Sequence, residues 1–123
     1  IPAATDEYCR MELRSADPSC NPYLAFALVI AAGMEGIKQR MPLPPALDTN
    51  LYDADPESLK NLPRIPENLG VAIELARQSA FIRQVLPLKT IDKFLTSKLV
   101  EWKDYTQAEH KGEFEKELYF LKV

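Results

Sequence analysis

The sequence predicts an α+β fold, in which three to four helices follow a single N-terminal strand. Two observations predict it. Side chains alternate with a period of two over residues 8–14, as in a strand, and apolar residues recur at helical spacing in long segments farther along. The chain has 123 residues, of which 46% are hydrophobic, so it is long enough for one domain and too apolar for a disordered segment.

The strand is expected to carry its charges on one side. Cysteine, methionine and leucine side chains alternate there with Arg10, Glu12 and Arg14. These three charged residues share one face, and each lies about 6.6 Å from the next along the strand. Residues 17–22 (D-P-S-C-N-P) then end the strand, because they combine two prolines with turn-forming residues.

The first helix is expected over residues 22–39. Asn21 is a good N-cap, and Pro22 fits the first helical position because its missing N–H has no partner there. The first three turns are apolar on every side, so this helix should be covered on every side.

Between the first and second helices lies a long connector, residues 41–66, with six of the ten prolines. It should be extended or turn-like surface chain, with a short helical turn around residues 56–59.

Three further helical segments follow the connector. Asn68 should cap a helix over residues 69–78, and Ser79 should cap a short one over residues 80–86. The last long helix should begin near Thr90 and be interrupted at Gly112. The residues expected to face the core are Ile73, Ala76, Ile91, Phe94, Leu95, Leu99, Trp102 and Tyr105.

Composition excludes several classes of protein. The net charge is −3 and no basic run is present, which argues against a nucleic-acid partner or an anionic membrane surface. The longest uncharged apolar run, residues 23–34, is shorter than the ~20 residues that span a bilayer. Cys9 and Cys20 are too few for a disulfide scaffold, suit a reducing cytoplasm and are expected to be packing residues. The single histidine, His110, is expected at the surface.

The predicted elements do not form a complete domain, because one strand has no partner strand and one helix is apolar on every side. A strand needs partners for its N–H and C=O groups, so we expect the chain to be the end of a larger unit whose other strands lie upstream. A first residue other than methionine fits that expectation. The alternative is a self-contained helical domain with an irregular leading segment.

The charged face has two interpretations. The commoner one is a solvated row of alternating charges. The other is a site for an anionic substrate, in which Glu12 holds a divalent cation while Arg10 and Arg14 take phosphate or carboxylate oxygens. The spacing of these three residues alone favours the solvated row of charges.

A family resemblance changes this weighting. Residues 10–25 read R-M-E-L-R-S-A-D-P-S-C-N-P-Y-L-A and resemble the R-x-E-x-R-x-x-D-P-S-x-N-P-Y-L-A signature of bacterial type I glutamine synthetase. Shorter matches run across nearly the whole chain and lie at residues 1–3 (I-P-A), 32–38 (A-G-x-x-G-I-x), 50–53 (N-L-Y-D), 62–63 (L-P) and 101–102 (E-W).

The resemblance implies an ATP-dependent ligase that forms glutamine from glutamate and ammonia through γ-glutamyl phosphate. It implies Mg²⁺ or Mn²⁺, a cytoplasmic homo-oligomer, and a strand that belongs to the catalytic barrel. Residues 1–123 would then be the C-terminal portion of a catalytic domain, inactive alone.

The resemblance also implies residue roles. Glu12 resembles the carboxylate ligand of the metal that bridges the nucleotide phosphates. Arg14 resembles the catalytic arginine that holds the transferred phosphoryl group or the glutamate side chain, and Arg10 resembles a residue on the nucleotide side. Tyr52 resembles the tyrosine that is adenylylated in some members, although an ordinary loop tyrosine is the preferred interpretation.

Some family features are absent. The other metal-binding glutamates, the histidine and the ammonia-site residues belong to the part of the family sequence upstream of this chain. The H-P-W-E run common near the C-terminus is missing, which leaves the role of the tail open. Two alternatives therefore remain: a γ-glutamyl-amine (polyamine) ligase of the same fold, and a non-catalytic helical interaction module.

Overall fold

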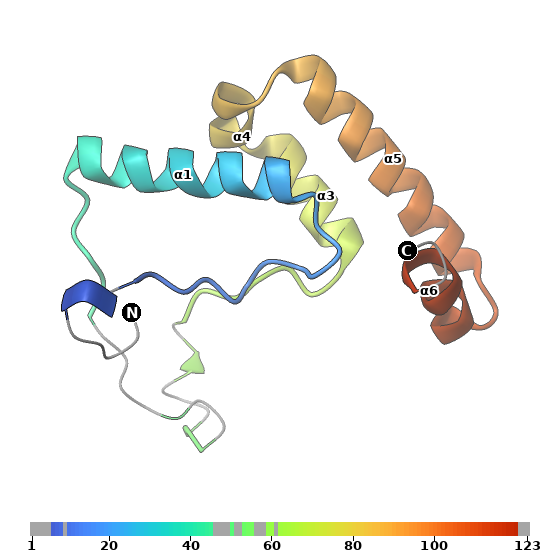
Figure 1. Ribbon diagram of the computed structural model, residues 1–123. Coiled ribbons are helices and arrows are strands. Elements are labelled where there is room, and N and C mark those ends of the chain that lie inside the picture. The colour runs from blue at the N-terminus through green and yellow to red at the C-terminus, as the bar shows by residue number, and fades with distance from the viewer. Residues whose placement is uncertain are drawn as a thin grey trace.

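The computed structural model describes residues 6–8, 10–45, 50, 53–55, 59–60 and 62–120. These residues form five α-helices after one turn of 3-10 helix at Asp6–Tyr8 (Figure 1). The α-helices are α1 (Pro22–Gln39), α3 (Leu69–Gln78), α4 (Ala80–Val85), α5 (Leu88–Gln107) and α6 (Lys111–Tyr119).

The expected N-terminal strand is not seen in the described part of the chain. Residues 10–14 are open chain that leads toward α1, and the end of the expected strand at Tyr8 lies in the 3-10 turn instead. The physical reason is that a strand exists only through hydrogen bonds to a neighbouring strand, and the described residues include no second one.

Helix α1 has the bounds that the sequence predicts. The Asn21 side-chain oxygen accepts hydrogen bonds from the N–H groups of Tyr23 and Leu24, at 3.0 and 3.3 Å, and Pro22 is the first helical residue. The helix ends at Arg40, whose φ of 50° is left-handed and turns the chain out of the helix.

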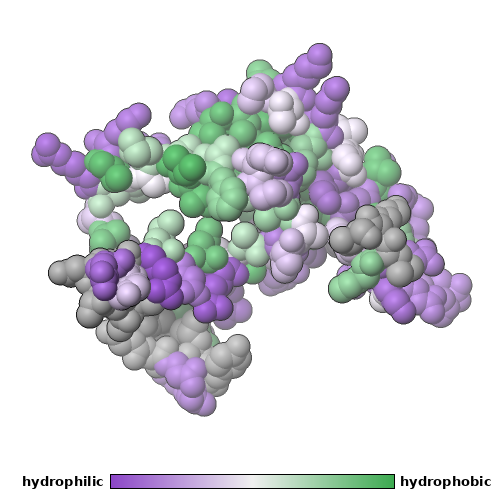
Figure 2. All heavy atoms as spheres, viewed as in Figure 1, coloured by the Kyte–Doolittle hydropathy of each residue, from purple (hydrophilic) through white to green (hydrophobic). Residues whose placement is uncertain are grey.

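The apolar surface of α1 is not covered as the sequence led us to expect. None of its residues is buried. The large apolar side chains that lie along one face, here called the α1 stripe, are 47–83% exposed; they are Tyr23, Phe26, Ile30, Met34 and Ile37. Figure 2 shows apolar residues at the surface over this region.

The core lies between α3 and α5. Ile73, Ile91 and Leu95 are the buried hydrophobic residues of the described chain, and all three were expected to face inward. Gly70 lets the helices approach, because a Cβ there would lie 2.6 Å from Nε1 of the Trp102 indole. The predicted caps are also confirmed: the Asn68 side chain accepts from the N–H of Val71, and Ser79 caps α4.

The break in the C-terminal helices differs from the expected one. Helix α5 begins at Leu88 and ends before Ala108, whose extended backbone (ψ 131°) starts the turn, while Gly112 lies inside α6. Aromatic packing accounts for the fold-back, since the Tyr105 ring lies edge-on to Phe114 with ring centroids 6.1 Å apart. The turn therefore did not need a glycine.

Two further results concern the expectations from the sequence. The short helical turn around residues 56–59 falls mostly outside the described residues. Among the described residues, no helix is both long enough and apolar enough to cross a membrane.

Candidate functional site

The structure brings Arg10, Glu12 and Arg14 together. Arg10 Nη2 lies 3.7 Å from Glu12 Oε2, and Arg14 Nη2 forms an ion pair with Glu12 Oε1. The side chain of Glu12 is 34% exposed and that of Arg14 is 86% exposed. Exposed ion pairs are worth little because water screens them, so this row stabilises the fold only weakly and stays accessible to a ligand.

A divalent cation does not fit the donors of the described chain alone. Magnesium and calcium take about six or more oxygen ligands. No group of three or more His, Cys, Asp or Glu side chains lies together within the described ranges. Glu12 is a single carboxylate already paired with two guanidiniums, so it supplies one ligand at most.

The turn between this row and α1 is held by side chains. Asp17 Oδ1 accepts hydrogen bonds from the N–H of Ser19 at 2.8 Å and from its hydroxyl at 2.5 Å. The N–H of Cys20 donates to the Asp17 carbonyl, and Asn21 then caps α1. The D-P-S-x-N-P half of the signature therefore sets the direction in which residues 10–14 leave the helix.

The charge of Asp17 contributes to this turn. The hydroxyl and then the N–H of Ser19 lower the pKa of Asp17 below its ordinary value of 3.8, with a further contribution from the Lys98 charge, while partial burial acts in the opposite direction. Because the folded pKa is depressed, the stabilisation is complete above the ordinary value and is lost as the pH falls through the folded one.

An open hollow of about 980 Å³ separates the turn from the helices. Its walls come from residues 14–21, the loop before α3, and the facing sides of α3 and α5. Its lining is partly apolar and partly charged or polar, and the charged and polar side chains include Arg14, Asp17, Lys98 and Tyr119. The candidate arginine therefore lies at the rim of a cavity rather than on a flat surface.

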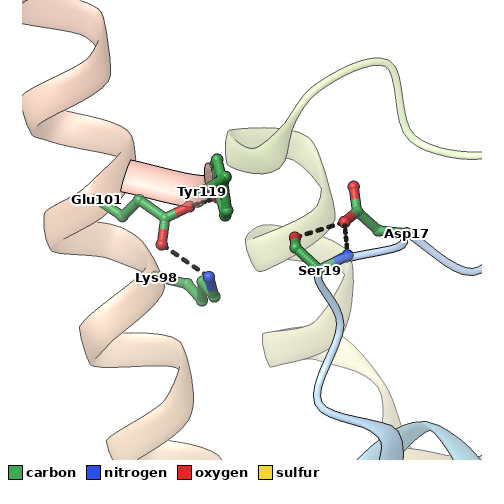
Figure 3. A network of polar contacts seen from close by, with 5 residues as sticks. All are labelled: Asp17, Ser19, Lys98, Glu101 and Tyr119. Atoms are coloured by element: carbon green, nitrogen blue, oxygen red, sulfur yellow. Dashed lines mark hydrogen bonds and ion pairs between the residues drawn. The ribbon is translucent and has the colours of Figure 1, made fainter. Parts of the chain in front are cut away.

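A polar network stands on the helical side of this hollow (Figure 3). Lys98 Nζ lies 2.7 Å from Glu101 Oε2, the Tyr119 hydroxyl donates to Glu101 Oε1, and Lys98 Nζ lies 5.8 Å from the centre of the Tyr119 ring. Burial, followed by the hydrogen bond to Glu101, raises the pKa of Tyr119 well above its ordinary value.

Sequence reasoning missed part of this network. In the sequence, Lys98 lies outside the set of apolar residues expected to face the core, and Tyr119 lies in the C-terminal tail, to which no role was assigned. The i,i+3 spacing of Lys98 and Glu101 is a signal for an ion pair on a helix, but nothing local connects either to Tyr119. That contact exists because α6 folds back on α5.

Other expected residues have mixed outcomes. His110 is exposed, as predicted. Cys20 is free and exposed, so the packing role expected for it is wrong. Cys9 and Tyr52 lie outside the described residues.

These features define a mostly helical segment with an exposed arginine–carboxylate–arginine row at its N-terminal end. Residues 1–117 match the family model described as glutamine synthetase, catalytic domain. The chain belongs to this family.

Similar proteins come from archaea and bacteria. A glutamine synthetase of Thermus thermophilus is 37% identical over 120 residues, which cover 96% of this chain and 27% of the relative. One from Methanocaldococcus jannaschii is 34% identical over 88% of this chain and 24% of its own length. One from Staphylococcus aureus is 31% identical over 97% of this chain and 27% of its own length. The chain thus spans about a quarter of the length of the curated relatives it matches.

Proposed function

We propose that residues 1–123 form the C-terminal portion of the catalytic domain of an ATP-dependent ligase. The ligase makes glutamine from glutamate and ammonia through γ-glutamyl phosphate. The match of residues 1–117 to the glutamine synthetase catalytic domain carries the proposal, and the relatives named glutamine synthetase support it. The long signature at residues 10–25 supports the bacterial type I branch as the finer assignment.

The proposal gives each charged residue of the row a role. Arg14 is the catalytic residue that holds the transferred phosphoryl group or the glutamate side chain, and its exposed guanidinium at the rim of the hollow supports this. Arg10 contacts the nucleotide. Phosphoryl transfer depends mainly on positioning and charge neutralisation, which guanidinium groups supply.

Glu12 is proposed as one ligand of Mg²⁺ or Mn²⁺, with the remaining donors contributed by parts of the domain outside this chain. Such a metal neutralises charge on the ATP phosphates. Because the described residues supply one ligand at most, we infer that the isolated chain is inactive.

The open surfaces support an incomplete domain. Residues 10–14 are open chain, and we infer that they pair as a strand with the catalytic barrel in the longer protein. The α1 stripe has no cover within the described residues, and a match to about a quarter of each relative leaves ample chain to cover it.

Assembly and location follow from the same proposal. The longer protein would form a cytoplasmic homo-oligomer, and the free, exposed Cys20 is compatible with a reducing compartment. Tyr52 is proposed as an ordinary loop tyrosine rather than an adenylylation site.

The test uses the longer protein that contains this chain. We expect phosphate release from ATP that requires glutamate, ammonia and Mg²⁺ or Mn²⁺. Glu12→Gln should raise the metal concentration needed for half-maximal activity by roughly 10- to 100-fold, as loss of metal-site groups typically does. Glu109→Gln, an exposed residue beyond α5, is the matched control and should behave as the unmodified protein.

The outcomes separate the alternatives. An unchanged metal requirement in Glu12→Gln would overturn the assignment of Glu12. Turnover with a polyamine in place of ammonia would favour the γ-glutamyl-amine ligase. Absence of turnover with either amine would favour the non-catalytic module.

A further inference from the structure

We propose that Lys98 is a positioning residue, which holds the turn of residues 17–21 in place from the opposite wall of the hollow. Through this turn it fixes the direction of the row formed by Arg10, Glu12 and Arg14. The effect on catalysis rests on the proposed function, whereas the effect on the turn does not.

The first step is that the Lys98 ammonium is itself held in place. Glu101 binds it at 2.7 Å, and the Tyr119 ring lies beneath it at 5.8 Å. The Tyr119 hydroxyl in turn donates to the other oxygen of Glu101. With side chains only 25% and 14% exposed, Lys98 and Glu101 are more restricted than surface residues, so the positive charge has a defined place (Figure 3).

The second step is that a negative charge stands across the hollow. Asp17 and Lys98 both line it. The Ser19 bonds both reach Oδ1 of Asp17, so the carboxylate is fixed on the turn. The Ser19 hydrogen bonds are the main cause of the lowered pKa of Asp17, and the Lys98 charge adds a smaller lowering. Burial and the Glu101 hydrogen bond are the main causes of the raised pKa of Tyr119, and the Asp17 charge adds to them, so the two sides of the hollow interact at long range.

The third step is that this attraction acts at a sensitive position. The turn lies directly between Arg14 and the N-cap of α1, so a rotation of the turn swings the whole charged row. Lys98 thereby connects α5 and α6, far along the chain, to the segment that carries the candidate catalytic arginine. The hollow is open to solvent, so the attraction is screened and its effect should be modest.

Hydrogen exchange of the Ser19 and Cys20 amides tests the turn directly in the 123-residue chain, because both amides bond to Asp17. In Lys98→Met we expect these amides to exchange about threefold faster, the scale of a solvent-screened charge pair. Lys98→Arg keeps the charge and should restore the original rate. Lys103→Met, an exposed lysine on the same helix, is the control and should change nothing.

A double-mutant cycle tests the path through Asp17. Asp17→Asn keeps an oxygen that can accept from Ser19 but loses the charge. In that background Lys98→Met should add no further change in exchange. Equal exchange in Lys98→Met and Lys103→Met, or a full Lys98→Met effect in the Asp17→Asn background, would overturn the proposal.

In the longer protein, Lys98→Met should lower kcat/KM by about threefold and Lys98→Arg should restore it. If the longer protein has no ligase activity, the proposed function fails, and the exchange measurement still decides the role of Lys98. If the protein is active and Lys98→Met retains full kcat/KM, the positioning role is refuted.

Discussion

At the residue scale, Gly70 decides how closely α3 approaches α5. A Cβ at this position would lie 2.6 Å from Nε1 and 2.7 Å from Cε2 of Trp102, and the indole is wedged at the helix contact. We expect Gly70→Ala to lower the free energy of unfolding by about 1–3 kcal/mol, as overpacking usually does. Urea unfolding followed by the fluorescence of Trp102, the sole tryptophan, measures this.

Gly33 offers a matched control for that substitution. It lies inside α1, and a Cβ there would meet nothing within 4 Å. Gly33→Ala should therefore stabilise the helix by about 0.5–1 kcal/mol, because alanine loses less backbone entropy than glycine. If Gly70→Ala were as stabilising as Gly33→Ala, the close contact with Trp102 would not be present in solution.

Residues of the signature also divide by what they do. Asp17, Ser19 and Asn21 are engaged in the turn and the cap. Among the described residues, Arg10 and Arg14 pair with Glu12, and Arg10 also donates to the Tyr8 carbonyl. The signature thus has two parts with different tasks. Residues 17–21 form the turn and the helix cap, and the charged row of Arg10, Glu12 and Arg14 precedes them in the chain.

At the element scale, the parts of the fold that depend on local chemistry were predictable. Asn21 and Pro22 fix the start of α1, and Asn68 and Ser79 fix the starts of α3 and α4, since each cap acts within three residues. The strand expected at residues 8–14 is not seen in the described part of the chain, because a strand forms only against a partner strand and these residues include no second one. The fold-back at Ala108 depends on packing between Tyr105 and Phe114, so Gly112 was a misleading cue.

The candidate site follows the same rule. Its charged row, Arg10 to Arg14, was predictable because alternate residues of an extended chain share a face, and the family signature added the chemistry. The Lys98–Tyr119 side of the hollow was not, because it joins residues that only the packing of α6 on α5 brings together. Sequence patterns predict neighbours along the chain far better than neighbours across a cavity.

The cap of α1 gives a prediction at this scale. Asn21→Ala should lower the free energy of unfolding by about 1 kcal/mol, because the N–H groups of Tyr23 and Leu24 lose their acceptor. Asn21→Ser keeps an acceptor and should stay within a few tenths of a kcal/mol of the unmodified chain. Thermal unfolding followed by circular dichroism compares the three. If Asn21→Ser lowered the free energy of unfolding as much as Asn21→Ala, the lost side-chain cap would not explain the destabilisation.

At the scale of the whole molecule, the described chain has more apolar surface than its own helices cover. Three hydrophobic residues are buried, whereas the five of the α1 stripe are 47–83% exposed along one helix face. An exposed apolar patch of this kind marks an interaction surface. In the longer protein we infer that the rest of the catalytic domain covers it, and the isolated chain should cover it by self-association.

This gives the last prediction. In analytical ultracentrifugation, the apparent mass of the 123-residue chain should rise with its concentration over the micromolar range. Phe26→Glu combined with Ile30→Lys places two opposite charges on the α1 stripe and keeps the net charge, so it should yield a monomer. Ala32→Glu with Gln39→Lys puts the same charges on exposed positions of α1 away from the stripe and should leave the association unchanged. A monomeric unmodified chain at the highest concentration would mean that the stripe needs no cover, and the inference of an incomplete domain would lose its main structural support.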